Sequence, residues 1–260
     1  MYSDLVGPMK KVSIGKARYF VTLFDSYSGY SMVRFIHRKS EASEEVKSMI
    51  RELEGLFETS IRRLTSINRN LVKWIRSDGG GEYMGHKFRD WLKKRRIHHE
   101  VTTAYSPESN GSAERLNRTL LDMARTMMTH LNKPREDLWA GAIMTECHIR
   151  NRLMTQSCHD ECTPYEVIHG WKPNVGYFRI FGSKAYVYKP KHSRQGKFDV
   201  RADEGIMVGY CKGDAYRVLL ADRKTIVESK DVKIIENEDC LLYTSPSPRD
   251  LSTSRMPSSA

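Results

Sequence analysis

Two carboxylates in the middle of the chain have the surroundings of a site for divalent metal ions. Asp78 lies in WIRSDGGGEY and Glu114 in SPESNGSAERLNR, with 35 residues between them. A third carboxylate, Asp4, lies near the start, in SDLVGP. Carboxylate oxygens suit hard cations such as Mg²⁺, and three of them can hold two ions over a phosphodiester. The sequence therefore favours two-metal phosphoryl transfer on a polynucleotide.

The composition points to a polyanionic partner. The chain has 260 residues and a formal charge of +11, which favours nucleic acid, although a basic soluble or ribosome-associated protein would share this charge. No apolar run approaches the ~20 residues that span a bilayer, so no membrane partner is expected. The five irregularly placed cysteines suit a reducing compartment. Cys158, His159 and Cys162 lack a second ligand pair, so we interpret the two cysteines as ordinary thiols.

The first carboxylate is expected on a short strand ahead of a hairpin. Gly7-Pro8 should end the strand that carries Asp4. Aromatic and β-branched residues predict two further strands, 19–24 and 30–36. The segment from Asp25 to Gly29 between them has the composition of a turn, so the two strands should form an antiparallel hairpin.

The second carboxylate is expected at the end of a buried strand. A helix should begin at Ser40, because three glutamates occupy its first turn. Its buried stripe is predicted to contain Val46, Met49, Ile50, Leu53, Leu56 and Phe57. A strand over 71–75 then places Asp78 at its carboxyl end, where a rigid sheet can hold it beside open space.

A basic helix is predicted over 84–96. Between Lys87 and Arg96 it has six basic residues and one aspartate. Two interpretations remain open for this charge, a solvated helix face or a contact with DNA. The following strand, 98–103, begins with His98 and His99, which point to opposite faces, so both are interpreted as structural.

The third carboxylate is expected in the first turns of a helix that follows a polar loop. The loop, 105–111, contains Pro107 and Asn110-Gly111, and a loop of this kind can clamp a substrate. The helix should begin near Ser112 and carry Glu114. Its predicted core side chains are Leu116, Leu120, Met123, Met127 and Leu131. Three side chains close to Glu114 can point at a phosphate backbone, namely Arg115, Asn117 and Arg118.

The second half of the chain changes in pattern. One more helix is predicted over 137–151, followed by a linker over 153–176 that contains a short helix, Pro164 to His169. The runs KAYVYKP, GIMVGYC, YRVLLAD and TIVESKDVKII predict a small all-β barrel over 177–238. Residues 239–260 are rich in Ser and Pro, and we interpret them as disordered or as a sequencing artefact.

Seven blocks in register resemble copia-type retrotransposon integrases. The resemblance covers roughly residues 3 to 237 and implies a mixed α/β, ribonuclease-H-like integrase core over 1–152, followed by an SH3-like barrel. The blocks are SDLVGPM, RYFVTLFDSYSGY, IRSDGGGEY, SPESNGSAERLNRTL, FRIFGSKAYVY, GIMVGY and ESKDVKI.

The resemblance implies a role for each site residue. Asp4, Asp78 and Glu114 match the catalytic triad of these enzymes, which binds two Mg²⁺ ions, or Mn²⁺ in vitro. The attacking oxygen comes from water when DNA ends are trimmed and from a DNA 3′-hydroxyl when they are joined to target DNA. The positions that match DNA contacts are Asn110, Gly111, Asn117 and Arg118, to which the helix geometry adds Arg115. Nuclear action, with a cytoplasmic stage in virus-like particles, and a homo-oligomer on paired DNA ends are also implied.

Several departures and rivals accompany this interpretation. The zinc-binding His/His/Cys/Cys module of the family does not occur in this sequence, so no zinc is expected and the chain is interpreted as a fragment of a longer polyprotein. Gly79 stands where the family usually has Asn. A ribonuclease H or a DDE transposase is a rival on the same scaffold. A degenerate or domesticated DNA-binding protein without catalysis is the rival from another class.

Overall fold

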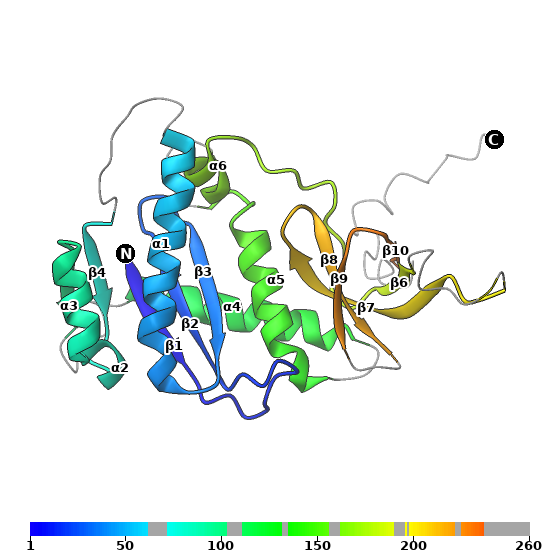
Figure 1. The fold of residues 1–260 in the computed structure, drawn as a ribbon, viewed down its shortest axis with the longest axis horizontal. Coiled ribbons are helices and arrows are strands. Elements are labelled where there is room, and N and C mark those ends of the chain that lie inside the picture. The colour runs from blue at the N-terminus through cyan, green and yellow to red at the C-terminus, as the bar shows by residue number, and fades with distance from the viewer. Residues whose placement is uncertain are drawn as a thin grey trace, which may run out of the picture.

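The computed structural model describes residues 1–61, 72–102, 111–131, 135–155, 162–189, 196, 198–221 and 225–236. Two sheets lie at opposite ends of the molecule, with helices around the first and between the two (Figure 1). Several predicted features lie outside the described residues, namely Asn110, most of the loop 105–111, the Cys158-His159 pair and the tail 239–260.

The first sheet is mixed, as the sequence predicts. Its strand order is β3-β2-β1-β4-β5. β1 (Tyr2–Val6), β2 (Tyr19–Phe24) and β3 (Ser31–Ile36) are antiparallel neighbours. β4 (Trp74–Ser77) pairs in parallel with β1, and β5 (His98–Val101) pairs in parallel with β4. The predicted mixed α/β fold class of this part of the chain is confirmed by this arrangement.

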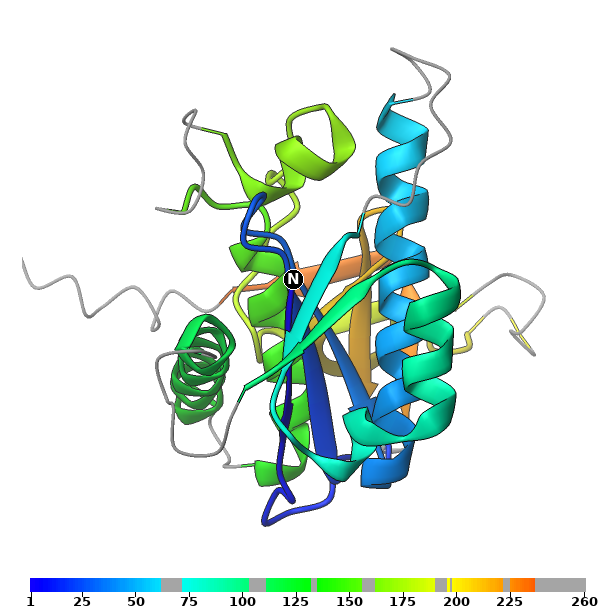
Figure 2. The same ribbon diagram turned by 90° about the vertical axis from the view of Figure 1, so that its left-hand side faces the viewer.

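Helices cover both faces of the first sheet (Figure 2). α1 (Ala42–Ile61), which follows the short η1 (Lys39–Glu41), lies on the same side as α3 (His86–Lys94). α4 (Gly111–Thr129) lies on the opposite side. The layer under α1 and α3 is a core that contains Val21, Leu23, Val46, Met49, Ile50, Leu53, Ile75, Phe88 and Leu92.

The predicted helix over 84–96 corresponds to α3 in the structure, which begins two residues later, at His86. α2 (Gly81–Met84) ends at Gly85, whose φ of −62° and ψ of 139° are extended, and α3 begins directly after it. The prediction was wrong about the start, because an extended residue cannot continue the helical hydrogen bonding. Phe88 and Leu92 are buried as expected, and Trp91 is half-buried.

The second sheet is antiparallel and has the order β10-β6-β7-β8-β9. Its strands are β6 (Lys184–Tyr188), β7 (Ala202–Cys211), β8 (Ala215–Leu220), β9 (Ile226–Ser229) and β10 (Val232–Ile235). The predicted small all-β unit is confirmed. Within the described residues β9 and β10 are the edges of the sheet, and no pairing between them closes it into a barrel.

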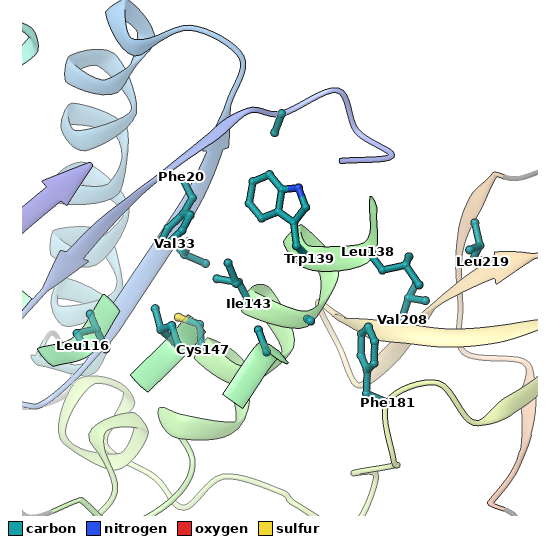
Figure 3. Packing of buried hydrophobic residues seen from close by; sticks show 14 of the residues in the cluster. Phe20, Val33, Leu116, Leu138, Trp139, Ile143, Cys147, Phe181, Val208 and Leu219 are labelled. Carbon is teal, nitrogen blue, oxygen red and sulfur yellow. The ribbon is translucent and has the colours of Figure 1, made fainter. Parts of the chain in front are cut away.

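One helix joins the two sheets. α5 (Trp139–Arg150), which follows η3 (Glu136–Leu138), packs between β3 and β7. Trp139, Ile143 and Cys147 of α5 share a core with Val208 and other residues of the second sheet (Figure 3). The hydrophobic core therefore continues from one sheet to the other.

The linker contains the predicted short helix. α6 (Pro164–His169) has a capping box, in which Thr163 and Glu166 each satisfy a backbone N–H of the other. Gly170 ends it in the left-handed conformation at φ 77°. The backbone N–H of Tyr165 donates to the carbonyl of Asn151 at 2.7 Å, which ties α6 to the end of α5. Among the helices described, none combines the length and hydropathy that crossing a bilayer would need.

Candidate functional site

Asp4 lies in the middle of the first sheet. β1 is the central strand of the five, and Asp4 is opposite Thr22 of β2. Its neighbour Ser3 is fully buried and points to the other face, because side chains alternate along a strand. The Asp4 side chain is half-buried and faces α4. The sheet thus presents this carboxylate to the helix that carries Glu114.

A buried asparagine holds the Asp4 carboxylate. Asn117 Nδ2 donates to Asp4 Oδ2 at 2.7 Å, and the backbone N–H of Leu5 donates to Asp4 Oδ1 at 2.9 Å. Thr22 Oγ1 in turn donates to Asn117 Oδ1 at 3.0 Å. The nitrogen and the oxygen of the Asn117 amide therefore both form hydrogen bonds within the protein.

The burial of Asn117 bears on one predicted DNA contact. Asn117 is only 4% exposed, and its side chain spans from Asp4 to Thr22. One N–H of the amide donates to Asp4 and the amide oxygen accepts from Thr22, so the side chain is directed into the protein. In the structure Asn117 supports Asp4, and its predicted contact with DNA stays a prediction.

The helical spacing of the apolar residues along α4 indicates that Asn117 is buried. The buried residues of the helix are Ala113, Leu116, Asn117, Leu120 and Ala124. They recur every three or four residues, so Asn117 belongs to the stripe that faces the core. Met123 falls off this stripe and is 49% exposed, so the prediction that it faces the core was wrong.

Asp78 follows β4 directly and is held by the glycine turn. Its Oδ1 accepts a hydrogen bond from the backbone N–H of Gly80 at 3.2 Å. A Cβ on Gly80 would lie 2.9 Å from the Glu82 carboxyl group and 3.1 Å from Asp78 Oδ1. Two carboxylates therefore converge on Gly80, and a larger residue there would push them apart.

Strand register explains why Asp4 and Asp78 meet. Tyr2 of β1 is paired in parallel with Arg76 of β4. Asp4 lies two residues beyond Tyr2 on β1, and Asp78 lies two residues beyond Arg76, directly after β4 ends at Ser77. The register therefore brings the two carboxylates near each other, and the charge of Asp78 acts on Asp4. The predicted delivery of Asp78 by the end of a strand matches this geometry.

Glu114 approaches from the helix. It lies in the first turn of α4, three residues before Asn117, so the two share one side of the helix. Its side chain is exposed. The hydrogen bond from Asn117 to Asp4 brings this part of α4 over the strand, with Glu114 one turn nearer the start of the helix.

The electrostatics of Asp4 reflect these neighbours. Burial raises the pKa of Asp4 to about 6, and the hydrogen bond from Leu5 opposes the rise. The negative charge of Asp78 raises this pKa further, the bond from Asn117 lowers it, and the charge of Glu114 adds a smaller increase. A cation between the carboxylates would relieve this repulsion.

The carboxylates are not drawn into one tight group. Of the residues that the structure describes, no three His, Cys, Asp or Glu side chains are close enough to hold a metal ion together. The donor types and the repulsion at Asp4 fit a hard cation, and the charge of exposed Glu114 also acts on Asp4. The three-carboxylate metal site therefore stays a prediction.

The other predicted DNA contacts lie at the start of α4. Arg115 and Arg118 are exposed, and Gly111 is the first residue of the helix. Arg115 Nη2 donates to Ser112 Oγ at 3.1 Å, which folds the guanidinium back along the first turn. Arg115 and Arg118 are accessible to a phosphate backbone, and their contact with DNA stays a prediction.

The sequence analysis missed a second support beneath the site. Ser3 Oγ and the Tyr83 hydroxyl share a buried hydrogen bond at 3.0 Å, and Tyr83 is fully buried. This bond ties β1, just before Asp4, to α2, just after Asp78. The motif DGGGEY contained the tyrosine, but nothing in one sequence shows its partner 80 residues away.

Comparison with known proteins places the chain among transposon polyproteins. It is 31% identical over 241 residues to the Retrovirus-related Pol polyprotein from transposon TNT 1-94 of Nicotiana tabacum, across 92% of this chain. The chain is a homologue of the integrase-like region of copia-type Pol polyproteins. It is also 26% identical to the polyprotein from transposon RE1 of Arabidopsis thaliana, across 91% of its length. The predicted resemblance is confirmed.

The integrase-like region matches further relatives in sequence. A family model described as the Retroviral polymerase SH3-like domain matches residues 183–247. The Transposon Ty1-BR Gag-Pol polyprotein of Saccharomyces cerevisiae is 24% identical across 93% of the chain. The chain spans 17% of the TNT 1-94 polyprotein, 15% of RE1 and 13% of Ty1-BR.

Solved structures resemble this integrase-like region at lower identity. The simian T-cell lymphotropic virus intasome in complex with PP2A regulatory subunit B56 gamma matches 91% of this chain and 78% of its own, at 17% identity and a TM-score of 0.45. The catalytic core domain of BIV integrase matches 64% of this chain and 92% of its own, at 19% identity and a TM-score of 0.41.

Proposed function

We propose that the chain is the catalytic and DNA-binding part of a retrotransposon integrase, which trims DNA ends and joins them to target DNA. The observation that carries this proposal is the parallel register of β1 and β4, which brings Asp78 within electrostatic reach of Asp4, with α4 tied to Asp4 by Asn117. The homology to copia-type Pol polyproteins supports the same reaction class, a polynucleotidyl transferase. DNA is the proposed partner, in a homo-oligomer that acts in the nucleus after a cytoplasmic stage.

Each residue of the site has a separate task in this proposal. Asp4, Asp78 and Glu114 would hold divalent cations, preferably Mg²⁺, which activate the attacking oxygen and stabilise the leaving one. Asn117 and the N–H of Leu5 keep both Asp4 oxygens in one orientation. Gly80 keeps the Asp78 carboxylate in place and leaves room beside it. Glu114 would complete the set from the first turn of α4.

A strand-transfer assay with labelled terminal-repeat DNA tests the proposal. Asp78→Asn should reduce product to background while DNA binding is kept, because the substitution removes a metal ligand and leaves the fold intact. Asp122→Asn is a matched control, since Asp122 is an exposed carboxylate further along α4. Equal activity of the wild type and Asp78→Asn would refute the proposal.

A second function, DNA binding without catalysis, has its own supporting observation. Within the described part of the chain no three carboxylates form a closed metal-binding group, and Glu114 is exposed. A chain of this kind would bind DNA equally well with and without Mg²⁺. It would also give no strand-transfer product in either the wild type or Asp78→Asn.

A further inference from the structure

A basic hollow lies between α3 and β5, on the side of the sheet away from α4. Its volume is about 420 Å³. It is lined by Met84, Arg89, Leu92, Lys93, Ile97, His98, His99 and Val101. Four of these residues are basic, namely Arg89, Lys93, His98 and His99, and the others are apolar. No Asp or Glu lines the hollow.

The charge of the hollow is not balanced nearby. Over the residues that the structure describes, neither Arg89 nor Lys93 makes an ion pair, and Lys93 is exposed. Burial lowers the pKa of His99, and the positive charges of Arg89 and His98 lower it further. The side chains around the hollow therefore disfavour a further positive charge and favour an anion.

One end of the hollow adjoins the carboxylate site. His99 Nε2 and Ser77 Oγ share a hydrogen bond at 2.8 Å, directly before Asp78. A Cβ on Gly79 would lie 3.8 Å from Val101 Cγ1, so Val101 lines the hollow and touches the glycine turn. An extended polyanion in the hollow would thus lead towards Asp78.

An exposed aromatic ring lies on the opposite face of the sheet from the hollow, around the edge strand β5. Trp74 pairs with His98, whereas the next pair, Ile75 and His99, faces α3. Trp74 is 57% exposed, although β4 is an interior strand, and its ring centroid lies 4.2 Å from that of His98. An exposed ring on which a base can stack, within reach of cationic side chains, is a combination that binds single-stranded nucleic acid.

We propose that this basic hollow binds the phosphate backbone of a nucleic-acid strand, with a base stacked on Trp74. Arg89 and Lys93 would neutralise the phosphates in the hollow, and the strand would pass around the edge strand β5, past His98, to reach the Trp74 ring on the other face of the sheet. The direction of the strand towards Asp78 rests on the proposed function, whereas the binding of the strand does not. The six basic residues of this stretch then divide into those that line the hollow and those that face solvent elsewhere.

Two lysines next to each other on α3 provide a matched test. Lys93 lines the hollow, while Lys94 is exposed and does not. Fluorescence anisotropy with a labelled single strand, in EDTA to prevent turnover, should show binding weakened roughly 5- to 10-fold by Lys93→Ala. The slope of log affinity against log salt should fall by about one, since one phosphate contact is lost. Lys94→Ala removes the same charge and should change the affinity less than about twofold.

Trp74 gives an independent readout. Trp74→Ala should weaken binding of the single strand roughly fivefold or more and should affect a matched duplex less, because stacked bases in a duplex are not free to contact the ring. Equal losses in Lys93→Ala and Lys94→Ala would overturn the proposal in favour of general surface charge. A second test follows the NMR resonances of His98 during titration. If they respond to inorganic phosphate but not to the oligonucleotide, the hollow is a site for small anions only, and the proposal of strand binding is overturned.

Strand binding in the hollow and the proposed catalytic function can be tested independently, because each can fail while the other holds. Binding that depends on Lys93, in a chain whose strand transfer does not depend on Asp78, would keep the hollow and reject the catalytic assignment. Strand transfer abolished by Asp78→Asn, with DNA binding unchanged by Lys93→Ala and Trp74→Ala, would do the reverse.

Discussion

Asn117 on α4 is joined to Asp4 on β1 by a 2.7 Å hydrogen bond from Nδ2 to Oδ2. The bond crosses from a helix to the central strand of the first sheet, between residues 113 positions apart. Together with the packing of Leu116 and Leu120 in the core, it holds the helix of Glu114 over the strand of Asp4. The geometry of the candidate site therefore depends on a residue that carries no charge.

Replacing Asn117 should affect both stability and activity. Asn117→Ala leaves Asp4 Oδ2 and Thr22 Oγ1 without their shared partner, which should cost roughly 1–3 kcal/mol in the free energy of unfolding. Urea denaturation measures this loss, and strand transfer should fall with it. Arg118→Ala, at the exposed neighbouring position, should change the unfolding free energy by less than about 0.5 kcal/mol. Similar losses in the two variants would contradict the supporting role of Asn117.

Divalent cations should stabilise the folded chain. Asp4 and Asp78 repel each other, and Mg²⁺ bound between them removes this repulsion in the folded state only. At a concentration of about ten times the dissociation constant, the gain is about 1.4 kcal/mol, or a few degrees in Tm. Scanning fluorimetry should show the shift in the wild type and in Asp122→Asn, and not in Asp78→Asn. A shift that sodium salts reproduce at equal ionic strength would show screening instead of binding.

Local patterns in the sequence predicted the elements that carry the site. The bounds of β2 match the predicted 19–24, because a run of aromatic and β-branched residues ends at the turn that begins with Asp25. Asp25 Oδ2 accepts bonds from the backbone and hydroxyl of Ser28, as a turn residue does. Asp78 follows β4 as expected. Signals of this kind depend only on neighbours along the chain.

Relationships between distant segments could not be predicted in the same way. Asn117 resembles a DNA contact because it is polar and follows Glu114, and only its place in the stripe with Leu116 and Leu120 reveals that it is buried. The bond between Ser3 and Tyr83 depends on how α2 packs beneath β1. The position of Glu114 relative to Asp4 and Asp78 depends on the position of a whole helix. Helical spacing indicates that Asn117 is buried, but no residue type or spacing identifies the residues that Asn117, Tyr83 and Glu114 approach.

Acid should loosen the junction between α5 and the second sheet. His148 of α5 is stacked on Tyr210 of β7, with ring centroids 4.8 Å apart, and shares a 2.6 Å hydrogen bond with the Tyr177 hydroxyl. Burial lowers the pKa of His148 to about 3, and the charge of Arg152 contributes. Since the unfolded chain takes up this proton near pH ~6.5, stability should fall by up to about 1.4 kcal/mol for each pH unit below that value, until the folded pKa is reached.

The contribution of His148 can be separated from that of other groups by comparing slopes. His148→Phe retains a ring for the stack and cannot be protonated, so its unfolding free energy should depend less on pH between about 6.5 and 4 than that of the wild type. His86→Gln, at an exposed histidine that begins α3, should keep the wild-type slope. Identical slopes in His148→Phe and the wild type would mean that the folded protein accepts the proton at His148.

Two helical glycines should respond in opposite directions to the same substitution. Gly141 of α5 faces β7 so closely that an added Cβ would lie 2.9 Å from the carbonyl oxygen of Val208, whereas a Cβ on Gly55 of α1 would meet nothing within 4 Å. Alanine favours a helix over glycine by about 1 kcal/mol, so Gly55→Ala should stabilise the chain. Gly141→Ala has to push α5 away from the second sheet, and overpacking of this kind costs about 1–3 kcal/mol, which exceeds the helical gain. Urea denaturation of both variants measures the two signs, and a stabilised Gly141→Ala would show that α5 can move off β7 without loss.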